Sequence, residues 1–206
     1  MKPKLRIALP KGRMSDETLE FFTERKILSQ GSAPTGRELI FQDSSGDFEF
    51  LLIRSKDVGT YVEQGAADMG IMGLDLLTEH RFDVNIVLPL PFGDCHLSVA
   101  HRSGHTEWRH RRNIRVATKY PHISSVYFFN RGFNIEIIQL YGSIEIAPIT
   151  GISDVITDLV STGATLKANG LQEEEQIMHS TAHLILNRAA YVHKRQFLNE
   201  IIDALS

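Results

Sequence analysis

Two carboxylates stand just upstream of a hydroxyl-rich turn near the C-terminal quarter of the chain. Asp154 and Asp158 belong to a mostly apolar run. The turn that follows consists of Ser161, Thr162, Gly163, Ala164 and Thr165. Backbone N–H groups converge in such a turn, and a helix that starts there adds positive potential, so the turn suits a phosphate monoester. Carboxylates repel a phosphate but accept hydrogen bonds from sugar hydroxyls, so the combination predicts a site for a phosphorylated sugar.

These assignments have plainer alternatives. The turn could be an ordinary helix cap, because Ser, Thr and Gly are common where helices start. Asp154 could be a solvated loop end. Asp158 lies inside the apolar run, where an unpaired carboxylate is costly to bury, and this favours a position that faces a cleft. We expect both carboxylates to hold the ribose 2′- and 3′-hydroxyls.

Cations follow the first two apolar runs of the chain. Lys11 and Arg13 flank Gly12, which would allow close backbone approach to a pyrophosphate or triphosphate; the alternative is a solvated loop. Arg54 ends the second run, where a buried guanidinium would need an anionic partner. Arg37 precedes another short apolar stretch and could be a surface arginine.

The hydrophobic pattern predicts alternating strands and helices. Strands are expected at residues 5–9, 48–53, 69–72, 115–118, 135–139, 155–160 and 179–186. Helices are expected at residues 56–64, 122–131 and 189–205, and after a Ser15 cap with Asp16 and Glu17 in the first turn. The last helix has an apolar side formed by Val192, Phe197, Ile201, Ile202 and Leu205. The rhythm restarts after Pro91, which predicts an α/β fold of two lobes with a cleft between them.

Composition narrows the class of protein. The chain has 206 residues, a net charge of −3 and one cysteine, Cys95, so it has no intrachain disulfide and no bulk positive field for nucleic acid. Its apolar runs are too short for a signal peptide or a membrane span, so we expect a cytoplasmic protein. The histidines of the basic stretch His101–Arg115 fit no metal-site spacing, and we expect a surface or a subunit contact there.

Six segments, in order along nearly the whole chain, resemble the ATP phosphoribosyltransferases, the first enzymes of histidine biosynthesis. The turn and its two carboxylates resemble the phosphoribosyl-pyrophosphate loop of that family. The other segments are Ile7–Arg13, Arg54–Glu63, Gly65–Asp75, Arg115–Pro121 and Leu140–Pro148. No Gly-x4-Gly-Lys-Ser/Thr pattern occurs, which argues against an ordinary P-loop NTPase.

The resemblance implies a fold and a set of roles. It implies two lobes of periplasmic-binding-protein type: residues 1–92 plus 179–206 would carry the ATP side, and residues 93–178 the phosphoribosyl-pyrophosphate loop. Catalysis would depend on Lys11, Arg37 and Arg54, which would contact substrate phosphates. The ATP contacts would be Lys11, Gly12, Arg13, Gly73 and Asp75, although helix–sheet packing is an equal alternative for the segment Gly70–Asp75. Tyr141 and Glu145 are further candidates for substrate contact.

The implied reaction transfers the phosphoribosyl group to N1 of the adenine of ATP, with Mg²⁺ held mainly by the substrate and without a firm protein ligand. Because the chain ends soon after its last expected helix, it resembles the short form of the family. Short forms work with a regulatory subunit that resembles histidyl-tRNA synthetase, usually as a hetero-octamer, and we expect self-association as well. Gly59 stands where the family often has proline, a difference that matters little if the turn is exposed.

Two rival functions share much of this pattern. One is a solute-binding or effector-sensing domain with the same two lobes, because fold alone does not define function. The other is a phosphoribosyltransferase with a different acceptor base, because the loop identifies the sugar better than the base.

Overall fold

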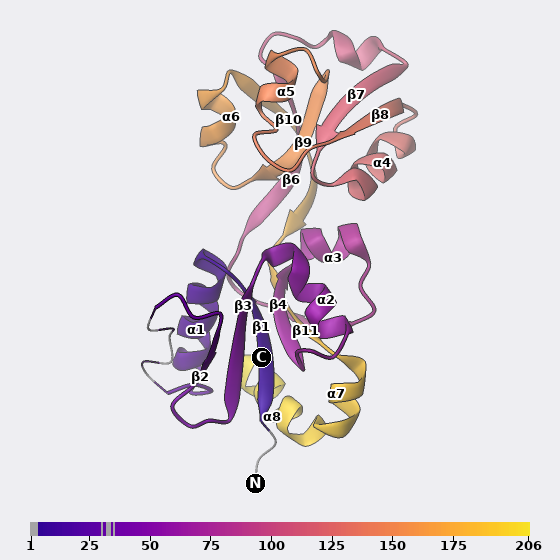
Figure 1. The fold of residues 1–206 in the computed structure, drawn as a ribbon. Coiled ribbons are helices and arrows are strands. Elements are labelled where there is room, and N and C mark those ends of the chain that lie inside the picture. Colours follow the sequence, from indigo (N-terminus) through magenta and orange to yellow (C-terminus); the bar gives the residue numbers. More distant parts are fainter. Residues whose placement is uncertain (1–3, 30, 32–33, 35) are drawn as a thin grey trace. The chain divides into compact units, whose positions relative to one another are not determined.

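The computed structural model describes residues 4–29, 31, 34 and 36–206 (Figure 1). The chain divides into two compact units. Unit 1 comprises Met1–Leu77, Arg81–Gly93 and Thr181–Ser206, and unit 2 comprises Thr78–His80 and Asp94–Ser180. Each unit is built on one mixed sheet with helices on both faces, so the predicted α/β class is confirmed.

Six strands form the sheet of unit 1 within the described residues, in the order β2-β3-β1-β4-β11-β5. They are β1 (Leu5–Pro10), β2 (Ile40–Gln42), β3 (Phe48–Ile53), β4 (Met69–Gly73), β5 (Asn85–Pro89) and β11 (Ala182–Leu186). The helices are α1 (Arg13–Glu24), the 3-10 turn η1 (Ser55–Asp57), α2 (Val58–Glu63), α3 (Leu74–His80), α7 (Arg188–His193) and α8 (Arg195–Leu205). Strand β1 is central and parallel to both β3 and β4, so three loops leave the same edge of the sheet.

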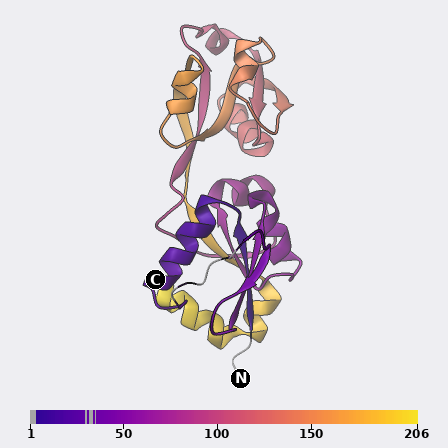
Figure 2. The same cartoon turned by 60° about the vertical axis from the view of Figure 1, so that its left-hand side comes forward.

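Side chains of β1 alternate between the two faces of this sheet and pack against helices on both. Leu5, Ile7 and Leu9 pack with apolar residues of α1 and α8, whereas Ala8 packs with α2 and α3 on the opposite face. Figure 2 shows α1 and α8 on one side of the strands and α2 and α3 on the other. Successive side chains of a strand point to opposite faces, so a strand with buried apolar residues on both faces, such as β1, requires helices on both sides of the sheet.

Unit 2 contains a five-stranded sheet, again counted over the described residues, in the order β10-β6-β9-β7-β8. The strands are β6 (Cys95–Arg102), β7 (Asn113–Thr118), β8 (Asn134–Gln139), β9 (Val155–Val160) and β10 (Leu171–Ser180). The helices are the 3-10 turn η2 (Glu107–His110), α4 (Pro121–Asn130), α5 (Ile146–Ile149) and α6 (Ala164–Ala168). Strand β9 lies in the middle, parallel to β7 and antiparallel to β6. None of the helices in the described part of the chain is long and apolar enough to span a bilayer.

Three local predictions were wrong. Helix α1 begins at Arg13 with Gly12 as its N-cap, and Ser15 lies within the first turn, where its Oγ donates to the Gly12 carbonyl at 2.7 Å. The predicted strand at residues 179–186 is two strands, because β10 pairs with β6 of unit 2 and β11 pairs with β4 and β5 of unit 1.

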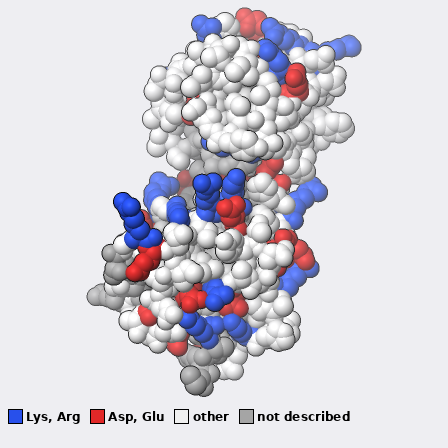
Figure 3. All heavy atoms as spheres, in the orientation of Figure 1, with Lys and Arg blue, Asp and Glu red and all other residues white. Residues whose placement is uncertain are grey.

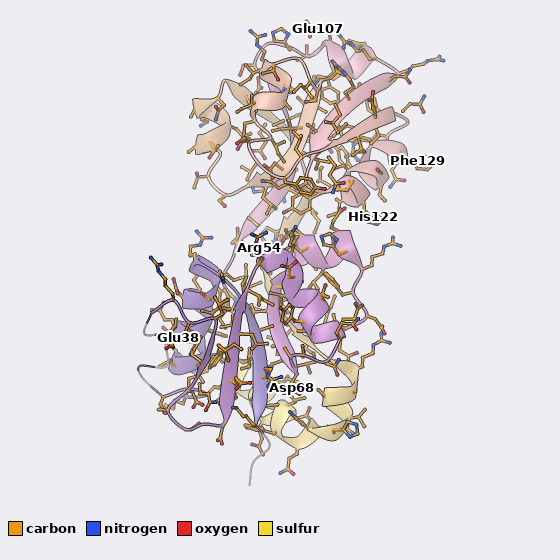
Figure 4. The ribbon with its side chains drawn as sticks, viewed as in Figure 1. Glu38, Arg54, Asp68, Glu107, His122 and Phe129 are labelled. Carbon is orange, nitrogen blue, oxygen red and sulfur yellow. The ribbon has the colours of Figure 1, made fainter. Side chains whose placement is uncertain are left out.

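The predicted C-terminal helix is also divided, into α7 and α8, at Lys194. The Lys194 Nζ donates to the Lys4 carbonyl and to Asp68, each at 2.8 Å, and Asp68 lies at the start of β4 (Figure 4). Because the helix is broken, Val192 does not share the apolar face of α8 and is 73% exposed, whereas Phe197 and Ile201 are buried as expected.

Gly59 lies in α2 and is buried, so the condition under which its difference from proline would matter little, an exposed turn, is not met. A Cβ atom at Gly59 would lie 2.4 Å from Cδ2 and Cε2 of the Phe82 ring and 2.6 Å from its Cγ. Real Cβ atoms do not approach carbon so closely, so the ring would have to move.

We expect Gly59→Ala to lower the free energy of unfolding by about 1–3 kcal/mol through this overpacking. In a helix position without such a neighbour, the same change from glycine to alanine would stabilise the helix by about 1 kcal/mol. Urea unfolding would measure the change. Gly142→Ala is the matched control, because a Cβ there meets nothing within 4 Å. A Gly59→Ala protein more stable than the parent would contradict the packing seen at Phe82.

Candidate functional site

The hydroxyl-rich turn joins the carboxyl end of β9 to α6. Gly163 is the N-cap of α6 and has a φ of 72°, a left-handed conformation that glycine adopts without strain. The Thr162 Oγ1 accepts a long contact of 3.4 Å from the Ala164 N–H. The first N–H groups of a helix have no acceptor within the helix, so an anion at this turn can accept hydrogen bonds from them.

A pocket of about 170 Å³ opens at this turn. Its lining residues are Glu145, Asp158, Leu159, Val160, Ser161, Thr162, Gly163, Ala164, Thr165 and Leu166. The structure therefore brings together all five predicted turn residues, the Asp158 carboxylate and Glu145, which the sequence offered only as a further candidate. A nest of N–H and hydroxyl donors with two carboxylates beside it can bind a phosphate and a diol at the same time.

Asp158 lies at the rim between the sheet and the pocket. Its side chain is 13% exposed, its Oδ1 accepts from the Leu159 N–H at 2.9 Å, and its Oδ2 lies 3.4 Å from the Lys119 Nζ. Burial raises the pKa of Asp158 above its ordinary value; Lys119 opposes this rise and the nearby Glu145 charge adds to it. The prediction that Asp158 faces a pocket rather than the apolar core agrees with this position.

Asp154 lies at the other end of β9, so the structure does not bring it to the turn. Asp154 directly precedes β9 and Asp158 lies within it, and four residues of extended backbone span about 13 Å, which separates the two carboxylates. The Asp154 carboxylate accepts from Arg111 Nη1 and from the Arg115 N–H, both at 2.8 Å. Burial alone would raise its pKa, but the hydrogen bonds from Arg115 and the charge of Arg111 outweigh burial and hold the pKa below its ordinary value.

Asp154 instead contacts Arg111 and Arg115 of the basic stretch His101–Arg115, for which the sequence predicted a surface or a subunit contact. His101 in this stretch is buried, with its ring nitrogens against the Arg102 carbonyl at 2.9 Å and Glu174 at 3.1 Å. No group of three or more His, Cys, Asp or Glu side chains that could hold a metal ion occurs among the described residues. The contacts seen for Asp154 and His101 hold unit 2 together and form no metal centre.

The cations predicted from the sequence lie at one edge of the unit-1 sheet. Lys11 and Arg54 directly follow β1 and β3, which are paired neighbours, and the Lys11 N–H donates to the Ile53 carbonyl at 2.8 Å. Gly12, with a φ of 101°, turns the chain from β1 into α1. Arg13 is exposed and lies 3.4 Å from Glu17.

Arg37 lies at the same edge of the sheet, but it precedes a strand instead of following one. It precedes β2, which is antiparallel to β3 and pairs Ile40 with Leu51 near the end of that strand. Figure 3 shows Lys and Arg side chains gathered at this end of unit 1, where Figure 4 labels Arg54. Arg54 is exposed, not buried as expected, and within the described part of the chain neither Arg37 nor Arg54 is in a salt bridge. These guanidinium groups can therefore reach an anionic ligand.

The segment Gly70–Asp75 divides between its two predicted roles. A Cβ on Gly70 would lie 2.8 Å from Val62 and 2.9 Å from Val58, so this glycine serves the packing of α2 on the sheet. Gly73 is the N-cap of α3 at the carboxyl end of β4, beside the edge that carries Lys11. Asp75 lies in the first turn of α3 and is buried.

Tyr141 and Lys119 are the two remaining residues of unit 2 to be placed relative to the turn. Tyr141 is 79% exposed and is not among the residues that line the pocket at the turn. Lys119, which contacts Asp158, was not singled out from the sequence. Its signal was present, because Lys119 follows β7 just as the turn follows β9, and parallel neighbours end at one edge.

We expect opposite effects on stability when the two aspartates are changed to asparagine. A lowered native pKa means that Asp154 stabilises the fold above its unfolded-state pKa and loses this as pH falls through the native pKa. A raised native pKa means that ionised Asp158 opposes folding once pH exceeds that pKa.

At neutral pH, Asp154→Asn should therefore lower the thermal midpoint and Asp158→Asn should leave it unchanged or raise it. The deficit of Asp154→Asn should shrink as pH falls below about 4, the ordinary range of Asp. Calorimetry over this pH range measures both variants, and a larger loss for Asp158→Asn at neutral pH would refute the assignment.

Comparisons with known proteins bear on the function of this site. The family model described as "HisG: ATP phosphoribosyltransferase" matches residues 54–206. An ATP phosphoribosyltransferase of Leptospira biflexa is 46% identical over 201 residues, covering 98% of both chains. Another, of Geobacter metallireducens, is 43% identical over 211 residues, covering 100% of this chain and 98% of the relative.

Solved structures agree with the sequence relatives. A chain of the ATP phosphoribosyl transferase (HisG:HisZ) complex from Thermotoga maritima superposes with a TM-score of 0.82 at 29% identity, covering 98% of this chain and 96% of that one. The substrate binding protein of an amino acid ABC transporter shares the fold alone, with a TM-score of 0.60 at 12% identity over 98% and 92% of the two chains. The periplasmic-binding-protein type of fold is thus confirmed. The chain belongs to the ATP phosphoribosyltransferase family, and it is a pentosyl-transferring enzyme.

Proposed function

We propose that this enzyme transfers the 5-phosphoribosyl group from phosphoribosyl pyrophosphate to N1 of the adenine of ATP. The products are phosphoribosyl-ATP and pyrophosphate, and the reaction is the first step of histidine biosynthesis. The observation that carries the proposal is the unit-2 pocket, in which a donor-rich turn and two carboxylates lie side by side.

The turn takes the 5′-phosphate in this proposal. Its donors are the first-turn N–H groups of α6 and the hydroxyls of Ser161, Thr162 and Thr165, which lie on the pocket wall. Asp158 and Glu145 accept hydrogen bonds from the ribose hydroxyls, because ionised carboxylates are acceptors only. Asp154 has no part in this contact, since it lies at the far end of β9.

The edge of the unit-1 sheet provides the positive charge that the reaction requires. Lys11, Arg13, Arg37 and Arg54 contact the pyrophosphate of one substrate and the triphosphate of the other, and Gly12 allows close backbone approach. Gly73 and Asp75 contribute to the ATP side from the start of α3. Guanidinium groups suit these ligands, because their planar donors match phosphate oxygens in pairs.

The chemistry needs anion stabilisation more than a base. The bond between ribose C1 and the pyrophosphate oxygen breaks, and its electron pair leaves with pyrophosphate. The adenine N1 lone pair forms the new bond to C1, so no proton has to be removed before attack. Donors held in place before the reaction stabilise the negative charge that develops on the leaving group.

Mg²⁺ is part of this proposal as a companion of the substrate. The ion would be bound mainly through substrate oxygens, as Mg²⁺ at phosphates commonly is. When bound, the ion neutralises charge on the pyrophosphate. We assign no side chain as its ligand.

A regulatory partner is proposed on the strength of the Thermotoga relative, which was solved as a HisG:HisZ complex. We propose that this chain assembles with a subunit that resembles histidyl-tRNA synthetase, in a hetero-octamer that also contains contacts between copies of this chain. Ultraviolet detection of phosphoribosyl-ATP, with and without that subunit, tests the reaction and the dependence on the partner together. Absence of product in both mixtures, with other bases accepted instead, would refute ATP as the acceptor.

Asp158 and Asp154 lie toward opposite ends of β9, so their asparagine variants form a matched pair that tests the pocket assignment. We expect Asp158→Asn to lower kcat/KM for phosphoribosyl pyrophosphate by about 10- to 100-fold, because hydrogen bonds to charged groups contribute about 1.5–3 kcal/mol. Asp154→Asn, directly before the same strand, should stay within about twofold of the parent, because it removes no substrate contact. Steady-state kinetics at fixed ATP would measure both, and equal losses would rule out the assignment of the ribose to Asp158.

A variant of Arg54 tests the proposal that the cations at the unit-1 edge contact substrate phosphates. Arg54→Ala should lower kcat/KM by about 100-fold, the usual scale for removing one donor to a developing anion, and should leave the thermal midpoint unchanged because the side chain is exposed. Arg188→Ala is the control, since Arg188 is also exposed but is paired with Asp83 at 2.8 Å. Turnover unchanged in Arg54→Ala would show that this arginine contacts no substrate phosphate.

A further inference from the structure

Lys119 reaches the unit-2 site without lining its pocket. Its Nζ lies 3.4 Å from the Asp158 Oδ2. The ten residues that form the pocket wall include two carboxylates, Glu145 and Asp158, and neither a lysine nor an arginine. Lys119 is thus the cation that balances an otherwise anionic wall, and it contacts the wall through Asp158.

The backbone holds Lys119 and Asp158 in fixed relation. Each residue directly follows one of a pair in the parallel strands β7 and β9, Thr118 and Thr157. The Thr118 Oγ1 donates to the Thr157 carbonyl at 2.9 Å and accepts from the Tyr120 N–H at 2.8 Å. Both threonines are fully buried, so the residues on either side of Lys119 are tied to β9. The position of Lys119 relative to Asp158 is therefore set by the backbone of β7 and β9 and not by the long lysine side chain alone.

The charges around Asp158 act in opposite directions. Lys119 faces it from the end of β7, and Glu145 faces it from the segment before α5. On β6 the paired residue is the uncharged Ser98, whose Oγ donates to Glu173 of β10, a carboxylate that also contacts His96 at 2.8 Å. Burial and Glu145 both favour a protonated Asp158, and a protonated carboxyl group would present a donor where the ribose hydroxyls need an acceptor.

We propose that Lys119 is a positioning residue that keeps the Asp158 carboxylate ionised and oriented to accept the ribose hydroxyls. The proposal rests on the function proposed above, because it takes Asp158 as the ribose contact. Leu159 N–H holds one carboxylate oxygen at 2.9 Å and Lys119 holds the other. Lys119 therefore acts on the substrate through Asp158 and touches no reacting atom.

Two variants of Lys119 distinguish the effect of its charge from the effect of its side-chain packing. Lys119→Met keeps most of the aliphatic stem and removes the charge, whereas Lys119→Arg keeps the charge. Calorimetric titration with phosphoribosyl pyrophosphate, from acid to alkaline pH, should show binding to Lys119→Met weakened about tenfold at the acid end and within about twofold of the parent at the alkaline end. Lys119→Arg should follow the parent throughout. A loss that is the same at every pH in Lys119→Met would overturn the proposal, because it would indicate a direct contact between Lys119 and the substrate.

A readout that needs no substrate distinguishes this proposal from the proposed function. With ¹³C-labelled aspartate, the carboxyl signal of Asp158 can be assigned by its loss in Asp158→Asn and followed against pH. Its titration should move to higher pH in Lys119→Met and stay near the parent in Lys119→Arg. An unmoved titration would overturn the role of Lys119, whereas a parent protein that fails to bind phosphoribosyl pyrophosphate would overturn the proposed function instead.

The double variant provides the last control. In an Asp158→Asn background, Lys119→Met should add no further pH dependence to binding, because the group on which Lys119 acts has been removed. Additional pH dependence would assign the effect to Glu145, Glu173 or His96 and would overturn the proposal.

Discussion

The extended backbone of β9 is the constraint on which the unit-2 site depends. This strand runs through the middle of its sheet, with Val155 and Ile156 fully buried and with partners on both sides. Its direction determines that the turn at Ser161 lies at the same edge as the end of β7. Its length determines that Asp158 meets the turn and Asp154 does not. A helix over the same residues would have placed the two carboxylates one above the other.

The same rule of parallel strands arranges the unit-1 edge. Lys11, Arg54 and Gly73 are far apart in sequence, but each directly follows or ends one of three adjacent parallel strands. Loops at the carboxyl ends of such strands are where α/β proteins bind ligands. The Lys11 and Arg54 side chains there are exposed, and among the described residues neither is in a salt bridge, whereas at the opposite edge Asp68 is paired with Lys194. This difference between the two edges supports a ligand site at the first.

Much of this arrangement could be predicted from residue patterns, and the failures have physical reasons. Strand β9 and its turn were recognisable because an apolar run ends abruptly in Ser, Thr and Gly. The structure does not bring the two aspartates together, because a spacing of four residues means proximity in a helix and separation in a strand. Lys119 follows a strand that the sequence predicts, but its place beside Asp158 depends on the pairing of β7 with β9, and strand order is not encoded in local pattern.

Other errors came from features that local sequence does not contain. Residues 179–186 read as one strand, but the chain leaves one sheet and enters another at Thr181. Val192 fits the apolar period of the last helix, yet a break at Lys194 turns it away from the core. Gly59 is required by the Phe82 ring, a contact between residues of different elements. In each case tertiary packing overrides a correct local pattern.

The central claim is that the β9–α6 turn binds the 5′-phosphate of the sugar through its backbone N–H groups. Amide ¹H–¹⁵N spectra of the protein, recorded during titration with ribose 5-phosphate, test this without requiring turnover or a partner. We expect the largest shifts at the amides of Thr162, Gly163, Ala164 and Thr165. Shifts concentrated instead at Lys11–Arg13, with the turn unchanged, would contradict the claim.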